Sequence, residues 1–280
     1  MLVGTLNVQA QRVGFAYWDV DRLYNTEESP FGNDSDFTPE GRYGWTAERY
    51  GQKVRSVAAV VDSMAMPVTV LYGVENEAVV RDIAAACTAD YSYLHRTLDS
   101  SDGLEFGVLY FGDVMQPQRV STAGMCLRID CRIAGRQTVL LLSRRSADGV
   151  SEALRVRCSE PEAAVMVMGR TDTEALTAAG VADAFAEEER AGRGTVMRRG
   201  VWRFDERICV DTMLAARGAV YARRHLFDRT GAPAATCVRG RYSGGVSSHL
   251  PLFVTVEWPA SRIENIEKQR LYHDGRQHHP

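Results

Sequence analysis

The sequence predicts an α/β (α+β) domain in which mixed β-sheets are covered by helices. Short runs rich in β-branched and aromatic residues recur along the chain, as they do in strands. Some of these runs are separated by amphipathic helical segments, and others follow each other closely enough to form hairpins. Helical crossovers connect parallel strands and hairpins connect antiparallel strands, so their mixture predicts mixed sheets. The uniform composition of the 280 residues favours one domain, residues 1–262, followed by a tail, residues 263–280.

In the first third of the chain we expect a strand at residues 2–8, a polar loop at residues 26–41 and a helix that opens at residues 45–50. Thr46 is a suitable N-cap for this helix. Apolar residues recur along it at helical spacing and predict one buried face: Val54, Val57, Ala58, Val61 and Met64. Pro67 ends the helix, and a buried strand at residues 68–72 precedes a second helix at residues 76–89.

The rest of the chain continues this alternation. Strands are expected at residues 106–110, 125–131 and 138–142, and a polar helix begins at Val150. An apolar run at residues 164–168 precedes an alanine-rich segment, residues 171–190, which we expect to form one helix. Further strands are expected near residues 195–197 and 207–210, and the β-branched and aromatic residues 252–258 predict a last buried strand.

Composition points to an ordinary soluble protein. Apolar residues make up 45% of the chain and charged residues 25%, and the net charge of −3 gives no overall attraction to nucleic acid or to an anionic membrane. No window of about 18 apolar residues occurs, so no membrane span is expected. The six cysteines include no C-x-x-C pair, which argues against a cysteine-bound zinc ion. We interpret them as reduced thiols and expect a cytoplasmic location.

Residues 236–251 form a glycine-rich turn and a polar Ser-Ser-His corner before the last strand. They resemble Thr-Tyr-x-Gly-x-x-Tyr-x-Gly-Gly-x-Ser-Asp-His-Leu-Pro, the closing motif of the endonuclease/exonuclease/phosphatase superfamily in its Bacteroides-type branch. Residues 36–53 also resemble that branch, as does Gly194-Thr195 with Gly200 and Trp202 behind it. The resemblance covers essentially the whole chain. It implies a deoxyribonuclease-I-like, four-layer α/β/β/α sandwich and metal-dependent cleavage of phosphate esters.

The resemblance also implies where the catalytic groups should lie, and three remnants of them are present. Asn7 matches the family's first-strand asparagine. A side-chain amide that only caps the end of the strand explains this residue equally well. An acid is retained at Asp205 or Glu206, with the register uncertain by one residue. His249 matches the closing histidine, for which a purely structural role is the alternative.

Five further family positions are changed. The metal-binding Glu is replaced by Gly73, and the phosphate-binding Arg by Asp102. The middle-strand His is replaced at about Leu140. The Asp of Gly-Asp-x-Asn is replaced by Arg170, and the Asp of Ser-Asp-His by Ser248. Glycine offers no side-chain ligand, and Asp102 is expected to repel a phosphate. Losing Asp at position 248 is expected to leave His249 without its carboxylate partner.

Three hypotheses follow. The first is a catalytically degenerate pseudoenzyme that acts as a binding module, requires no metal cofactor, and recognises either a small anionic ligand or a protein partner. The alternative is an active Mg-dependent phosphodiesterase, phosphatase or nuclease whose metal ligands have moved to Glu75, Asp172 and Asp205. In the third, Arg170 lies at the floor of the old cleft and holds a small anion, with its guanidinium where a metal would otherwise lie.

Overall fold

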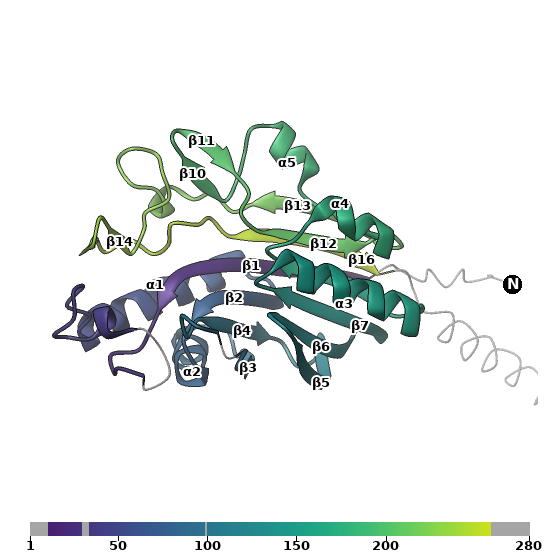
Figure 1. Ribbon diagram of the computed structural model, residues 1–280, viewed down its shortest axis with the longest axis horizontal. Coiled ribbons are helices and arrows are strands. Elements are labelled where there is room, and N and C mark those ends of the chain that lie inside the picture. Colours follow the sequence, from purple (N-terminus) through teal and green to yellow (C-terminus); the bar gives the residue numbers. More distant parts are fainter. Residues whose placement is uncertain (1–10, 30–33, 99, 259–280) are drawn as a thin grey trace, which may run out of the picture.

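Two six-stranded sheets pack face to face in the computed structural model, and helices cover their outer faces (Figure 1). The structure describes residues 11–29, 34–98 and 100–258. The first sheet has the order β13 (Ala215–Val220), β16 (Leu252–Trp258), β1 (Gln11–Leu23), β2 (Val68–Val74), β4 (Glu105–Tyr110) and β3 (Ser92–Arg96). The second has the order β5 (Met115–Ala123), β6 (Cys126–Ile133), β7 (Arg136–Ser143), β8 (Ala164–Gly169), β12 (Arg207–Asp211) and β9 (Val181–Asp183).

The helices and small elements complete the layers. Helices α1 (Ala47–Met64) and α2 (Glu77–Ala86) pack on the first sheet, and α3 (Ser146–Ser159) and α4 (Thr173–Leu176) pack on the second. Two hairpins lie outside the sheets, β10 (Val196–Arg198) with β11 (Val201–Arg203) and β14 (Cys237–Val238) with β15 (Arg241–Tyr242). The short helices are α5 (Ala186–Arg190), η1 (Ser35–Phe37), η2 (Thr177–Ala179) and η3 (Arg224–Leu226). The mixed sheets and their helical layers confirm the predicted fold class.

Strand β1 lies at the centre of the first sheet, parallel to β2 and antiparallel to β16. Its side chains alternate between two cores. Phe15 and Tyr17 face the other sheet, whereas Ala16 and Trp18 face the helices. The pairing register shifts between Asp19 and Leu23, so the strand carries an irregularity near its carboxyl end.

Helix α1 agrees closely with its prediction. The Thr46 hydroxyl caps it by accepting from the Arg49 amide, and the five apolar residues expected to share a face are all buried. The helix ends at Met64, two residues before the position that directly precedes Pro67, because Ala65 adopts a left-handed conformation with φ of 52°. The predicted face is therefore buried as expected, in the core that also contains Trp18 of β1 and Leu71 of β2.

The alanine-rich segment at residues 171–190 was wrongly expected to be one helix. It contains α4, η2, β9 and α5 in succession. Gly180 is left-handed with φ of 68°, and Val181–Asp183 pairs with β12 instead of continuing the helix. Tertiary pairing at the sheet edge thus overrides the helical propensity of alanine. The strand expected at residues 2–8 and the boundary expected at residue 262 lie outside the described residues.

The carboxyl ends of two parallel pairs meet at one end of the sandwich. In the first sheet, β1 and β2 run parallel with Asp19 opposite Tyr72. In the second sheet, β7 and β8 run parallel with Ser143 opposite Gly169. The Arg144 guanidinium, just beyond β7, lies 5.4 Å from the centre of the Tyr72 ring, which shows that the two ends adjoin. Loops beyond the carboxyl ends of parallel strands are where α/β folds place their sites.

Among the described residues, no helix is both long and apolar enough to cross a membrane.

Gly169 provides a stability test of this junction. It has φ of 110°, and a Cβ atom there would lie 2.4 Å from the Ser143 carbonyl oxygen. We expect Gly169→Ala to lower the free energy of unfolding by about 3 kcal/mol or more, because left-handed strain adds to a backbone clash. Gly135→Ala, at φ of 74° with no atom within 4 Å of the new Cβ, is the matched control and should lose about 1 kcal/mol. Urea denaturation measures both; equal losses would contradict the predicted clash.

Candidate functional site

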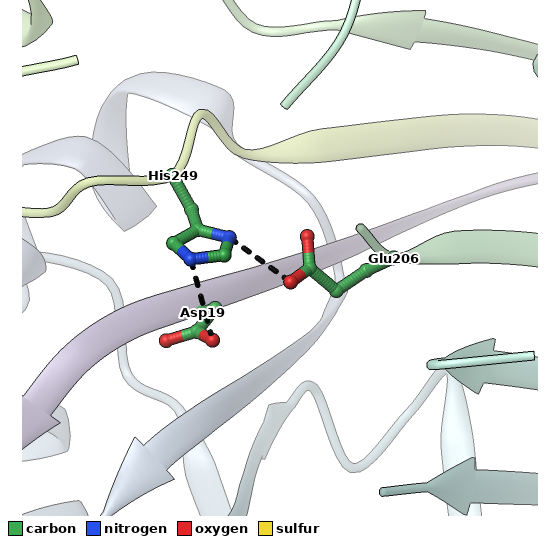
Figure 2. Close-up of side chains that lie close together, drawn as sticks. All are labelled: Asp19, Glu206 and His249. Atoms are coloured by element: carbon green, nitrogen blue, oxygen red, sulfur yellow. Dashed lines mark ion pairs between the residues drawn. The ribbon is translucent and has the colours of Figure 1, made fainter. Parts of the chain in front are cut away.

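Three titratable side chains meet where the two sheets end (Figure 2). Asp19 belongs to β1, Glu206 directly precedes β12, and His249 lies in the segment that leads into β16. The cluster therefore joins both sheets. We call these residues the acid–histidine triad.

His249 lies between the two acids. Its Nδ1 atom is 2.9 Å from Glu206 Oε1, and its Nε2 atom is 3.8 Å from Asp19 Oδ2. The Nδ1 to Oε1 contact is a close ion pair whose N–H direction is not aligned for a good hydrogen bond. The Glu206 side chain is only 2% exposed, and its Oε2 atom accepts from the Thr195 hydroxyl at 3.1 Å.

Backbone contacts hold the histidine against β1. The Trp18 indole donates to the His249 carbonyl at 2.9 Å. The Ser247 hydroxyl donates to the Asp19 carbonyl at 2.6 Å and accepts from the His249 amide at 3.0 Å. The bonds from Trp18 and to Asp19 connect residues more than 200 positions apart, so the closing segment is fixed directly on the central strand.

Burial and neighbouring charges shift the pKa values of the triad residues. Burial alone would lower the pKa of His249, but Glu206 and then Asp19 raise it from 6.5 to about 9. Burial raises the pKa of Asp19 from 3.8 to about 6, against the opposing effect of the positive charge on His249. At neutral pH, His249 is therefore an imidazolium paired with two carboxylates.

This geometry corrects two expectations. Glu206 faces His249, whereas Asp205 forms an ion pair with Arg198, so the acid of the site is Glu206. His249 also does not lack a carboxylate partner. Ser248 is half-buried and offers no charge, yet Glu206 and Asp19 both approach the imidazole.

Gly73, which the resemblance places at the family's metal-binding Glu, lies beside the triad. Gly73 has φ of 85°, and a Cβ atom there would lie 3.2 Å from Asp19 Oδ1, so a side chain at this position would point at the triad. Glu75 does not replace it. Its Oε2 atom accepts from the Asn25 amide at 2.7 Å, and the residue lines a separate cavity.

Asp102 is not an unpaired negative charge. Its two carboxylate oxygens each accept from Arg144 at 2.9 Å, a bidentate pair. Arg144 also donates to the Leu104 carbonyl at 3.0 Å. The expectation that Asp102 repels a phosphate is thus incomplete, because Arg144 neutralises it.

Arg170 and Asp172 serve different purposes. Asp172 caps α4 by accepting from the Ala175 amide at 3.0 Å, so its carboxylate is not among the triad. Arg170 is exposed and forms no ion pair with Asp19 or Glu206 in the described part of the chain. Leu140, near which the middle-strand histidine was expected, is fully buried between the sheets.

Arginines line a small cavity next to the triad. We call this the arginine cavity; its volume is ≈ 310 Å³ and its lining includes Arg144, Arg145, Arg170, Tyr72, Ser100 and Ser101. Tyr72 is the register partner of Asp19 and so connects the cavity to the triad.

Sequence reasoning missed Asp19 and Tyr72. Asn7 was expected to supply the first-strand polar group, but it lies outside the described residues. In the described structure, the strand between β2 and β16 carries Asp19. The available signal was an acid inside the long apolar run of residues 13–20.

The triad does not fit a magnesium ion well. Magnesium prefers oxygen ligands in octahedral geometry, whereas here an imidazole lies between the two carboxylates and position 73 supplies none. The donor atoms nevertheless lie within 4.8 Å of one another, and Glu206 Oε1 and His249 Nδ1 have no hydrogen-bond partner among the described residues. A proton on His249 already offsets one of the two negative charges without any ion.

The raised pKa of His249 makes stability depend on pH. The pKa of about 9 in the folded chain exceeds the ordinary 6.5, so folding favours the protonated form. This stabilisation is complete below pH 6.5 and is lost as the pH rises through 9. We expect the difference in unfolding free energy between the wild type and His249→Gln to fall across this window by at most roughly 3 kcal/mol. Urea denaturation from pH 6.5 to 9 tests it, with the exposed His225→Gln as control; a flat difference would contradict the charged triad.

Comparisons with known proteins agree with the fold. Residues 14–152 match the model of the Endonuclease/Exonuclease/phosphatase family, and no curated protein matches the chain. An endonuclease/exonuclease/phosphatase family protein from Bacteroides thetaiotaomicron has a TM-score of 0.58 at 14% identity, covering 89% of this chain and 96% of that one. A mannosyl-6-phosphatase of the same species has a TM-score of 0.55 at 15% identity, covering 87% and 99%. D. rerio TDP2 complexed with single-strand DNA product has a TM-score of 0.53 at 14% identity, covering 88% and 98%. With the family match and this shared fold, the chain belongs to the endonuclease/exonuclease/phosphatase superfamily.

Proposed function

We propose that this chain is a catalytically degenerate member of its superfamily that acts as a binding module. The observation that carries the proposal is the gap at Gly73. A side chain at this position would face Asp19, and among the described residues the acids expected to replace it lie elsewhere, with Glu75 bound to the Asn25 amide and Asp172 capping α4.

The state of His249 supports the same proposal. A general base must be free of its proton near neutral pH, yet two carboxylates raise the pKa of this imidazole to about 9. Removing one group that stabilises a transition state commonly costs about 3 to 4 kcal/mol, and this site lacks several. The remaining groups therefore stabilise the junction of the sheets and leave little for catalysis.

A second candidate is an active metal-dependent phosphoesterase. The observation in its favour is the convergence of Asp19, Glu206 and His249 within 4.8 Å, because a divalent ion that displaced the proton from His249 would find three donors there. The similar structures include a mannosyl-6-phosphatase and a TDP2 with a DNA product, so phosphate monoesters and DNA ends are the substrates to test first.

A cytoplasmic location is part of the proposal. All six cysteines are free thiols, and burial raises the pKa of Cys126 and Cys131 to about 12, which makes them poorly reactive. Free thiols are typical of a reducing compartment.

The proposal predicts no metal-dependent turnover. With Mg²⁺ or Mn²⁺, we expect no release of phosphate from mannose 6-phosphate or p-nitrophenyl phosphate and no nicking of plasmid DNA. The metals should also leave the thermal midpoint unchanged, whereas a metal at a hundred times its dissociation constant would add about 2.7 kcal/mol and raise the midpoint by several degrees. Turnover above the blank that His249→Gln abolishes would instead establish the second candidate.

A further inference from the structure

We propose that the arginine cavity binds a small phosphate dianion, either a phosphate monoester or inorganic phosphate. The inference rests on the proposed function, because an active hydrolase would consume a bound monoester rather than retain it. It concerns the side chains that follow β7 and β8, and it assigns no role to the triad as ligand.

The two parallel strands bring the arginines together. Ser143 and Gly169 are register partners at the carboxyl ends of β7 and β8, and the Arg170 amide donates to the Ser143 carbonyl at 2.9 Å. Arg144 and Arg145 follow the first strand and Arg170 follows the second, so all three residues line the same cavity. The close approach at Gly169 is what places the two chain segments side by side.

Two of the three arginines have uncompensated charge. Asp102 neutralises Arg144 through the bidentate pair. Arg145 and Arg170 are exposed, and within the described chain their side chains take part in no ion pair or hydrogen bond. These two side chains therefore contribute a charge of about +2 to the cavity lining, which complements a phosphate dianion, and paired guanidinium groups match the geometry of phosphate oxygens.

The size and polarity of the cavity define the ligand further. A volume of ≈ 310 Å³ is at the small end of ligand sites, so it suits a phosphate with a compact substituent. Ser101 is exposed at its rim and offers a hydroxyl donor. A phosphodiester carries one negative charge and matches a charge of +2 less well than a dianion does.

Asp102 competes with the ligand for Arg144. The Asp102 side chain is 45% exposed, so it can move aside and release Arg144 to a bound dianion. Removing its charge should therefore tighten binding. A purely structural pair predicts the opposite, namely no change or weaker binding, because its loss would loosen the cavity wall.

Isothermal titration calorimetry in EDTA, at pH 8 and low ionic strength, tests the proposal with inorganic phosphate, glycerol 2-phosphate and dimethyl phosphate. We expect both dianions to bind and the diester to bind at least roughly tenfold more weakly. Arg145→Gln and Arg170→Gln should each weaken dianion binding roughly tenfold, because each removes charge-assisted hydrogen bonds. Arg170→Lys should retain part of the affinity, and Asp102→Asn should tighten binding several-fold. Arg132→Gln, on an exposed part of β6, is the matched control and should leave binding unchanged.

Tighter binding of glycerol 2-phosphate than of phosphate would identify a monoester as the ligand, and the reverse would identify free phosphate. The proposal is overturned if neither dianion binds, or if Arg132→Gln weakens binding as much as Arg145→Gln and Arg170→Gln do. Thermal midpoints of all variants show that they are folded. Because the titrations contain EDTA, they report on the cavity even if a separate assay finds metal-dependent turnover, so the inference and the proposed function can fail independently.

Discussion

A protonated histidine between two buried carboxylates connects the two sheets of this protein. Asp19 and Glu206 are 10% and 2% exposed at their side chains, and buried carboxylates are stable only when they are paired. His249 supplies the positive charge. Its backbone is in turn fixed to the central strand by Trp18 and Ser247. The polar cluster at the end of the sandwich therefore depends on the charge of one side chain.

Under the proposed function, the same pairing disfavours a bound metal ion. A metal that binds His249 must first displace its proton, and two carboxylates hold that proton tightly at neutral pH. A carboxylate at position 73 would add negative charge beside Asp19 and shift the balance toward a divalent cation. With glycine at this position, the His249 proton has only two carboxylates to offset instead of three. The glycine at position 73 and the protonated His249 therefore act together on the charge of the site.

Local patterns predicted the elements well, and the resemblance of residues 236–251 predicted the layered fold. The last strand begins at Leu252 as expected, and Thr46 caps α1. The site was predicted less well because its contacts connect distant residues. Arg144 pairs with Asp102 across 42 positions, and nothing in either local segment indicates that pairing. The choice between Asp205 and Glu206 was also open, since only the position of His249 in space distinguishes them.

Lys53 shows how the helical layer helps to position the triad. Asp21 and Arg22 are both left-handed with φ of 55°, a strained conformation for non-glycine residues at the irregular end of β1. The buried ammonium group of Lys53 in α1 donates to their carbonyl oxygens at 2.5 and 3.4 Å. Burial lowers the pKa of Lys53 to about 8, against the opposing charge of Asp21. Keeping this buried ammonium group charged therefore costs folding free energy. The Asp21 amide then donates to Asp19 Oδ1 at 2.9 Å, which fixes the carboxylate that faces His249. The direction of the Asp19 side chain is therefore determined from outside the sheet, by a lysine on the helix that covers it.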